Sequence, residues 1–101
     1  MDISVADAPA RSRFEASRGD ALAGFAEYRL RDDTITMTHT EVDDAFEGQG
    51  VGGALVRSAL DIARERGLAV LPACPFVREW IARHADYATL VPDAERAGFG
   101  L

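Results

Sequence analysis

Alternation of apolar and polar residues predicts β-strands in the first half of the chain. A strand over Ala21–Arg31 places most of its apolar residues on one face and its charged residues on the other. The neighbouring segments Arg13–Ser17 and Thr34–Val42 are short and suited to strands, the second being rich in threonine. Residues 1–11 have a mixed pattern that assigns no element.

The second half of the chain combines helical spacing with one short apolar run. Apolar residues recur along Gly50–Arg66 with the period of an amphipathic helix, and Gly67 is suited to its C-terminal cap. Leu68–Leu71 is continuously apolar, as in an interior strand, and Pro75 is suited to the first turn of a second helix. The predicted order is β-β-β-α-β-α, with residues 92–101 as a flexible tail.

Size and composition narrow the classes of protein. A chain of 101 residues with 48% apolar residues fits one domain over residues 1–101. All 11 basic residues are arginine, so a lysine-dependent phosphate loop or Schiff base is excluded. The net charge of −6 argues against a nucleic-acid partner, and no apolar run reaches membrane-spanning length. The single cysteine, Cys74, excludes an internal disulfide, and we expect a cytoplasmic protein without a metal.

The segment Glu47–Gly53 is a candidate anion-binding loop because it joins a predicted strand to a predicted helix. Backbone N–H groups at a helix N-terminus favour anions, and glycine lets a phosphate approach the backbone closely. The glycine spacing is not that of a dinucleotide-binding fold. Glycines alone are also compatible with a mobile linker that caps the helix.

The segment FEGQGVGGALVRSALDIARERGL resembles motif A of the GCN5-related N-acetyltransferase (GNAT) superfamily, Arg/Gln-x-x-Gly-x-Gly/Ala followed by an amphipathic helix. Gly50 and Gly52 take the two glycine positions, and Glu47 stands where Arg or Gln is usual. The alternative register Gln49-x-x-Gly52-x-Ala54 restores that residue but fits the helix less well. The flanking segments THTEV and LPACPFVREWIARHADYATLV are similar to the small, single-domain members of this superfamily.

The resemblance covers residues from about Ala21 to Val91 and implies a minimal GNAT fold of the α/β (α+β) class. This fold has a mixed, mostly antiparallel sheet and two helices. It implies acetyl-CoA as co-substrate, bound between two splayed parallel strands, here Thr34–Val42 and Leu68–Ala73. The implied cofactor-binding residues are Val42, Gly48, Gln49, Gly50, Val51, Gly52 and Gly53.

The implied activity is N-acetyl transfer from coenzyme A to an amine acceptor, either a small molecule or a protein, by a monomer or weak homodimer. The extra helices and strands that wall in the acceptor in fuller members are not found here. We therefore expect an open site, a partner subunit or a large acceptor. Two alternatives stay open: a module that binds coenzyme A without turnover, as sensor or subunit, and a small interaction domain without ligand.

Three residues are candidates for the chemistry. His39 and Glu41 fall on the same alternating positions as Ile35 and Met37, and this face is expected to carry the cofactor. Histidine can accept a proton near neutral pH, although an exposed sheet residue is an equal interpretation. Cys74 precedes a helix, where a thiolate is favoured, and small GNAT relatives carry a cysteine there. It is a candidate nucleophile or acceptor-side residue, or else a small buried cysteine.

Overall fold

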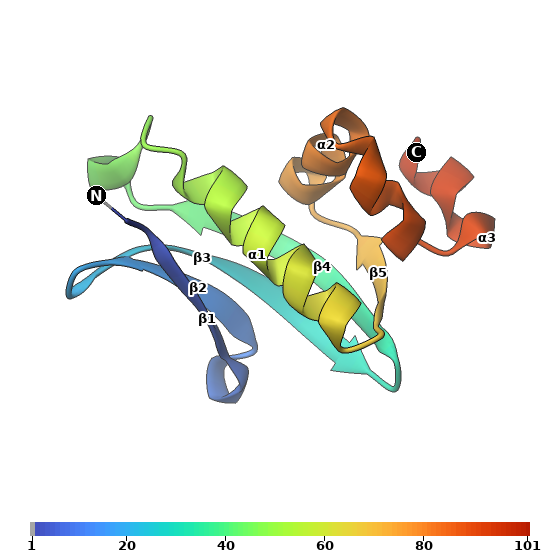
Figure 1. The fold of residues 1–101 in the computed structure, drawn as a ribbon, viewed down its shortest axis with the longest axis horizontal. Helices are drawn as coiled ribbons and strands as arrows, with labels where there is room; N and C mark the ends of the chain where they lie inside the picture. Colours follow the sequence, from blue (N-terminus) through green and yellow to red (C-terminus); the bar gives the residue numbers. More distant parts are fainter. Residues whose placement is uncertain (1) are drawn as a thin grey trace.

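The computed structural model describes residues 2–101 and contains a five-stranded sheet whose strand order follows the sequence (Figure 1). The strands are β1 (Ser4–Ala8), β2 (Arg13–Arg18), β3 (Ala21–Arg31), β4 (Thr34–Val42) and β5 (Ala69–Pro72). Neighbouring strands from β1 to β4 are antiparallel, and β5 is parallel to β4. This confirms the predicted mixed, mostly antiparallel sheet.

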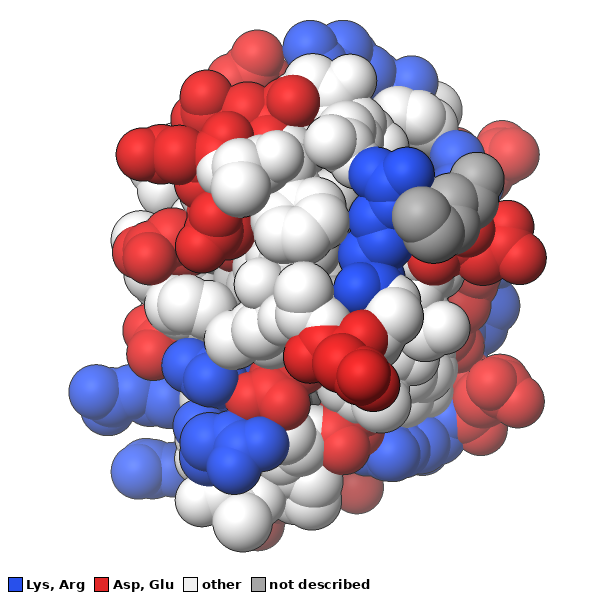
Figure 2. Space-filling view, turned by 90° about the vertical axis from the view of Figure 1, so that its left-hand side faces the viewer, with Lys and Arg blue, Asp and Glu red and all other residues white. Residues whose placement is uncertain are grey.

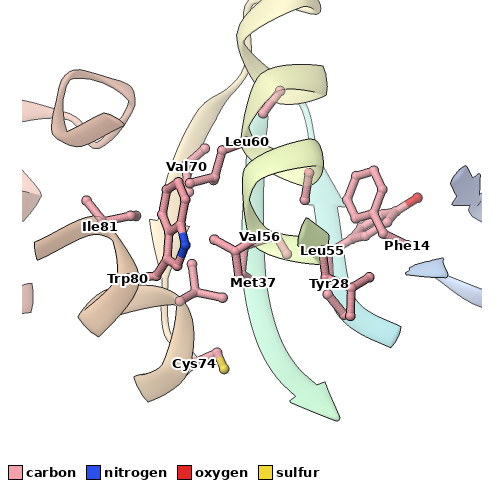
Figure 3. Close-up of a cluster of buried hydrophobic side chains, with 14 of the residues drawn as sticks. Phe14, Tyr28, Met37, Leu55, Val56, Leu60, Val70, Cys74, Trp80 and Ile81 are labelled. Carbon is pink, nitrogen blue, oxygen red and sulfur yellow. The ribbon is translucent and has the colours of Figure 1, made fainter. Parts of the chain in front are cut away.

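Helix α1 (Val51–Glu65) crosses one face of the sheet, and α2 (Pro75–Arg83) lies beside it (Figure 1). The apolar stripe of α1 packs on Phe14, Met37 and Val70 of the sheet, so the core lies between these two layers (Figure 3). Burying a side chain of this size stabilises the fold by about 1.5–3 kcal/mol. The helix stripe consists of Val51, Leu55, Val56, Ala59, Leu60 and Ala63.

Both ends of the chain contain structure that the sequence pattern did not assign. β1 pairs along its whole length with β2, and Tyr28 in β3 donates a hydrogen bond to Asp7 Oδ1 at 2.6 Å. Part of the segment expected to be a flexible tail forms a short helix, α3 (Asp93–Arg96). Arg96 ties it to the preceding segment by donating from Nε to the carbonyls of Ala88 and Val91.

A bulge interrupts the pairing of β3 with β4. Glu27 pairs with His39, but the next residue, Tyr28, pairs with Met37, so Thr38 is an extra residue in β4. An extra residue shifts the alternation of side chains along the bulged strand. Before the bulge the odd-numbered side chains of β4 face the helices, and after it the even-numbered ones do.

In residues 2–101 no helix is both long and apolar enough to cross a lipid bilayer.

Candidate functional site

The loop between β4 and α1 needs glycine at two positions. A short 3-10 turn over Asp44–Phe46 leaves β4, and its cap Asp43 accepts a hydrogen bond from the N–H of Ala45 at 2.9 Å. Gly48 and Gly50 then adopt φ angles of 80° and 78°. These angles lie in the left-handed region, which a side chain disfavours. Because both positions are glycine, the chain can turn sharply into the first residues of α1.

The first turn of α1 leaves backbone N–H groups for an external partner. The helical hydrogen bonds begin where Ala54 donates to the carbonyl of Gly50 at 3.0 Å. Val51, Gly52 and Gly53 come before this bond, so their N–H groups have no carbonyl four residues back within the helix. Gly50 has no side chain to cap them. The helix dipole adds a partial positive charge at the same place.

A groove of about 500 Å³ runs along this helix start. Its walls come from the end of β4, the glycine loop, the first turn of α1 and the first turn of α2: Val42, Phe46, Glu47, Gly48, Gly50, Val51, Gly52, Gly53 and Phe76. The structure thus brings together every predicted cofactor-binding residue except Gln49. The side chain of Gln49 instead accepts a hydrogen bond from Arg18 of β2.

The two parallel strands separate beside the groove. β5 pairs with β4 only from Thr34 to Met37, and the N–H of Cys74 then donates to the carbonyl of Met37 at 2.8 Å. After Cys74 the chain turns into α2, whereas β4 continues to Val42 with β3 on its other side. The edge of residues 38–42 that faces away from β3 therefore has no paired strand within the described residues. An extended ligand with amide groups fits such an edge.

Charges around the groove are mixed. Asp43, Asp44 and Glu47 lie on the approach to the helix, and Glu47 lines the groove. Figure 2 looks at this end of the molecule and shows acidic groups around a largely uncharged centre, with arginines beside them. Arg18 of β2 donates a hydrogen bond from Nη1 to the side chain of Gln49, and its Nε is buried without a hydrogen-bond partner among residues 2–101. No arginine is among the described residues that line the groove, so its candidate donors for an anion are the backbone N–H groups of the first turn of α1.

Cys74 and Thr40 meet at the point where the strands separate. Cys74 is the N-cap residue of α2 and its side chain is 4% exposed. Its Sγ lies 3.5 Å from Thr40 Oγ1. Sequence reasoning missed Thr40, because simple alternation from Met37 places it on the other face. Only the bulge turns it toward the helices.

The structure corrects the expected placement of His39 and Glu41. The side chains of His39 and Glu41 do not share a face of the sheet with Ile35 and Met37, which are buried under the helices. Past the bulge, Glu41 pairs with Phe25, and both lie on the face of the sheet away from α1. The two candidates do contact each other, with His39 Nε2 3.2 Å from Glu41 Oε1. Both are more than half exposed.

A second hollow of about 480 Å³ lies at the other end of β4. It is lined by the β3–β4 turn, where Arg29 and Arg31 project beside Thr34, and by Leu71 of β5. Within the part of the chain that the structure describes, no helix starts there, and none of the predicted site residues lines it. The groove at the glycine loop is therefore the better candidate for an anionic cofactor.

Comparison with known proteins relates the sequence of this chain to a family. The profile of a family described as GCN5-related N-acetyl-transferase matches residues 13–90. Protein NATD1 of Xenopus tropicalis is 33% identical over 48 residues, covering 48% of this chain and 44% of that protein. Streptothricin acetyltransferase of Streptomyces lavendulae is 38% identical over 63 residues, covering 60% of this chain and 33% of that enzyme. The chain spans less than half the length of both relatives.

Solved structures show the same fold. A GCN5-like protein from Staphylococcus aureus aligns with a TM-score of 0.67 over 88% of this chain and 87% of that one, at 24% identity. Rv2747 from Mycobacterium tuberculosis, solved in complex with CoA, aligns with a TM-score of 0.55 at 28% identity. That match covers 73% of this chain and 47% of Rv2747. The family profile matches more than three-quarters of this chain. The chain therefore belongs to the GCN5-related N-acetyltransferase family.

Proposed function

We propose that the domain binds acetyl-CoA in the groove at the glycine loop and transfers the acetyl group to an amine. One observation carries this proposal: the glycine loop, the open N-terminus of α1 and the unpaired edge of β4 line or border one groove. The first two provide donors for a pyrophosphate, and the third provides partners for an extended amide chain. The coenzyme A bound to Rv2747 and the acetyltransferase activity named for the Streptomyces relative support the same assignment.

The N–H groups of Val51, Gly52 and Gly53 would hold the pyrophosphate, with left-handed Gly48 and Gly50 keeping side chains away from it. The backbone of residues 38–42 would pair with the pantetheine amides. This route ends at Cys74 and Thr40, where the strands separate. The thioester would therefore lie next to the opening between β4 and α2.

Acetyl transfer needs a neutral amine near the thioester and a group that takes its proton. His39 is the candidate for that role, and Glu41, 3.2 Å away, would orient its ring. Because both lie on the face without α1, the amine would approach from that side of the sheet. The amine nitrogen would attack the thioester carbonyl, the C–S bond would break, and the thiolate would take up a proton. A route through acetyl-Cys74 is a distinct alternative that experiment can separate.

The test is release of free coenzyme A thiol and mass spectrometry of acetylated products, with polyamines, amino acids and basic peptides as acceptors. A general base typically contributes about 10²–10⁴-fold, so His39→Gln should lower turnover by at least about 100-fold. His84→Gln is a matched control, because the His84 ring stacks on that of Trp80, with centroids 3.8 Å apart, and His84 does not line the groove. Equal activity of the two variants would remove His39 from the mechanism. Full activity of Cys74→Ala would end the covalent route and leave direct transfer.

A second function is favoured by one specific observation, the carboxylate of Glu47 in the groove wall. A negative charge there opposes tight binding of a phosphate-rich ligand. Glu47 also departs from the Arg or Gln that is usual at this position of motif A, and this departure favours a module that senses coenzyme A without turnover. Binding of acetyl-CoA together with no product from any acceptor would support this alternative. Glu47→Gln should then tighten binding, most clearly at low salt.

A further inference from the structure

Arg18 connects the end of β2 to the glycine loop. It is the last residue of β2, which runs in the same direction as β4 because both strands are antiparallel to β3. The turn after β2 and the glycine loop therefore lie at the same end of the sheet (Figure 1). There Nη1 of Arg18 donates a hydrogen bond to the side chain of Gln49. Among residues 2–101, no other arginine side chain hydrogen-bonds a residue of the loop Glu47–Gly53.

The guanidinium of Arg18 has unused capacity for an anion. Its Nε is buried without a hydrogen-bond partner among residues 2–101, and none of the ion pairs formed by these residues includes Arg18. A shielded donor without an acceptor costs free energy, which an acceptor supplied by a ligand would recover. Nε and Nη of arginine form a planar fork that matches two oxygens of a phosphate. By turning away from Gln49, Arg18 can present both nitrogens to such a group.

The space beside the glycine loop is open. A Cβ placed on Gly48 or on Gly50, the residues that flank Gln49, would have no atom within 4 Å. Both glycines also line the groove. A ligand in the groove therefore meets no side chain over these two residues, and it can cross the loop toward the side where Gln49 contacts Arg18.

The order of the strands gives the direction in which each half of coenzyme A would leave the pyrophosphate. β5 lies on one side of β4, and β3 and β2 lie on the other. The pantetheine arm would follow the β5 side of β4 to Cys74, as proposed above. The nucleotide half would then leave the first turn of α1 across the glycine loop, away from Cys74 and toward the end of β2. This half carries a phosphate on the 3′-oxygen of its ribose, and Arg18 ends β2.

We propose that Arg18 binds the 3′-phosphate of coenzyme A and exchanges its hydrogen bond to Gln49 for that phosphate. This inference rests on the proposed function, because it takes the groove as the coenzyme A site. The described lining of the groove contains the carboxylate of Glu47 and no arginine. Arg18 therefore supplies, from outside the groove, a positive charge for the nucleotide end of the cofactor.

The experiment compares coenzyme A with 3′-dephospho-coenzyme A, which lacks only that phosphate. Dissociation constants are measured by calorimetry at one ionic strength for the wild type, Arg18→Gln, Arg18→Lys and Arg29→Gln. Lysine keeps the positive charge without the fork. Arg29→Gln is the matched control, because Arg29 also takes part in no ion pair among residues 2–101 but lines the hollow at the other end of β4.

We expect the wild type to bind coenzyme A about tenfold more tightly than the dephosphorylated ligand, since a hydrogen bond to a charged group contributes about this much. Arg18→Gln should weaken coenzyme A binding by about tenfold and change binding of the dephosphorylated ligand less than twofold. Arg18→Lys should fall between the wild type and Arg18→Gln. Arg29→Gln should bind both ligands as the wild type does.

Phosphorus NMR of the complex gives a second reading, because the 3′-phosphate has its own signal. Its second pKa should be lower in the wild-type complex than in free coenzyme A, since a neighbouring guanidinium favours the dianion. An unchanged pKa of this phosphate would overturn the inference without the use of any variant.

Equal weakening of both ligands by Arg18→Gln, or weakening of neither, would overturn the assignment to the 3′-phosphate while leaving the cofactor site in place. A wild type that binds neither ligand would instead overturn the proposed function and this inference with it. Thermal unfolding shows whether Arg18→Gln is folded, and the phosphorus signal of the wild-type complex decides the question if it is not.

Discussion

The packing of Phe76 on Gly52 makes a quantitative prediction about Gly52→Ala. Alanine is favoured over glycine inside a helix by about 0.5–1 kcal/mol. Its Cβ would lie 2.6 Å from Phe76 Cζ, so the ring would retreat by about 1 Å to reach van der Waals contact. Overpacking of this kind costs about 1–3 kcal/mol. We expect Gly52→Ala to lower the free energy of unfolding by up to about 2 kcal/mol.

A double-mutant cycle isolates the contact. In the Phe76→Ala background the clash is gone, so Gly52→Ala should stabilise the domain by about 0.5–1 kcal/mol. The coupling free energy between positions 52 and 76 should then be about 1–3 kcal/mol. Urea denaturation of the wild type, both single variants and the double variant gives this value.

Gly53→Ala is the matched control for the cycle. A Cβ at Gly53 would meet Trp80 Nε1 at 3.7 Å, an ordinary contact. This substitution should stabilise the domain by about 0.5–1 kcal/mol with either residue at position 76. A coupling below about 0.5 kcal/mol between positions 52 and 76 would refute the steric argument, and with it the explanation for glycine at position 52.

Further predictions concern the loop and two titrating groups. Gly50→Ala and Gly67→Ala should each destabilise the fold by about 1–2 kcal/mol, since both have positive φ, but only the first should weaken coenzyme A binding in a calorimetric titration. Burial, with the hydrogen bond to Asp7, raises the pKa of Tyr28 from 10.0 to about 12. The free energy of folding that the neutral Tyr28 hydroxyl contributes is therefore lost as pH rises from 10.0 to about 12. Thermal melts should show this alkaline loss in the wild type and not in Tyr28→Phe; the same loss in both would contradict it. Hydrogen bonds from two arginines lower the pKa of Glu15 from 4.5 to about 2, so stability should fall from pH 4.5 toward 2 by an amount that Glu15→Gln removes.

The fold could be predicted because its signals are local. The amphipathic stripe of α1 and the apolar run of β5 can each be recognised within a few residues. β1 is different, since five mixed residues form a strand only because β2 pairs with them. The family resemblance, carried by the glycine loop and its helix, is confirmed by the profile match over residues 13–90.

The site could be predicted only in part. The loop residues are adjacent in sequence, so their common groove was foreseeable. The side chains that each face of β4 carries could not be predicted. The extra residue Thr38 arises from the pairing of β4 with β3, and the alternation of apolar and polar residues does not reveal it. It separates His39 from the helix side and turns Thr40 toward Cys74. The contact of Phe76 with Gly52 joins two helices and likewise depends on packing. The roles of the site residues stay predictions.

The most direct test of the central claim is an amide NMR titration of the domain with coenzyme A and with acetyl-CoA. The account predicts shift changes centred on residues 49–53, Val42 and Cys74, with both ligands competing for the same site. No change at millimolar ligand, or changes centred instead on Arg29, Arg31 and Leu71 at the other end of the sheet, would contradict it.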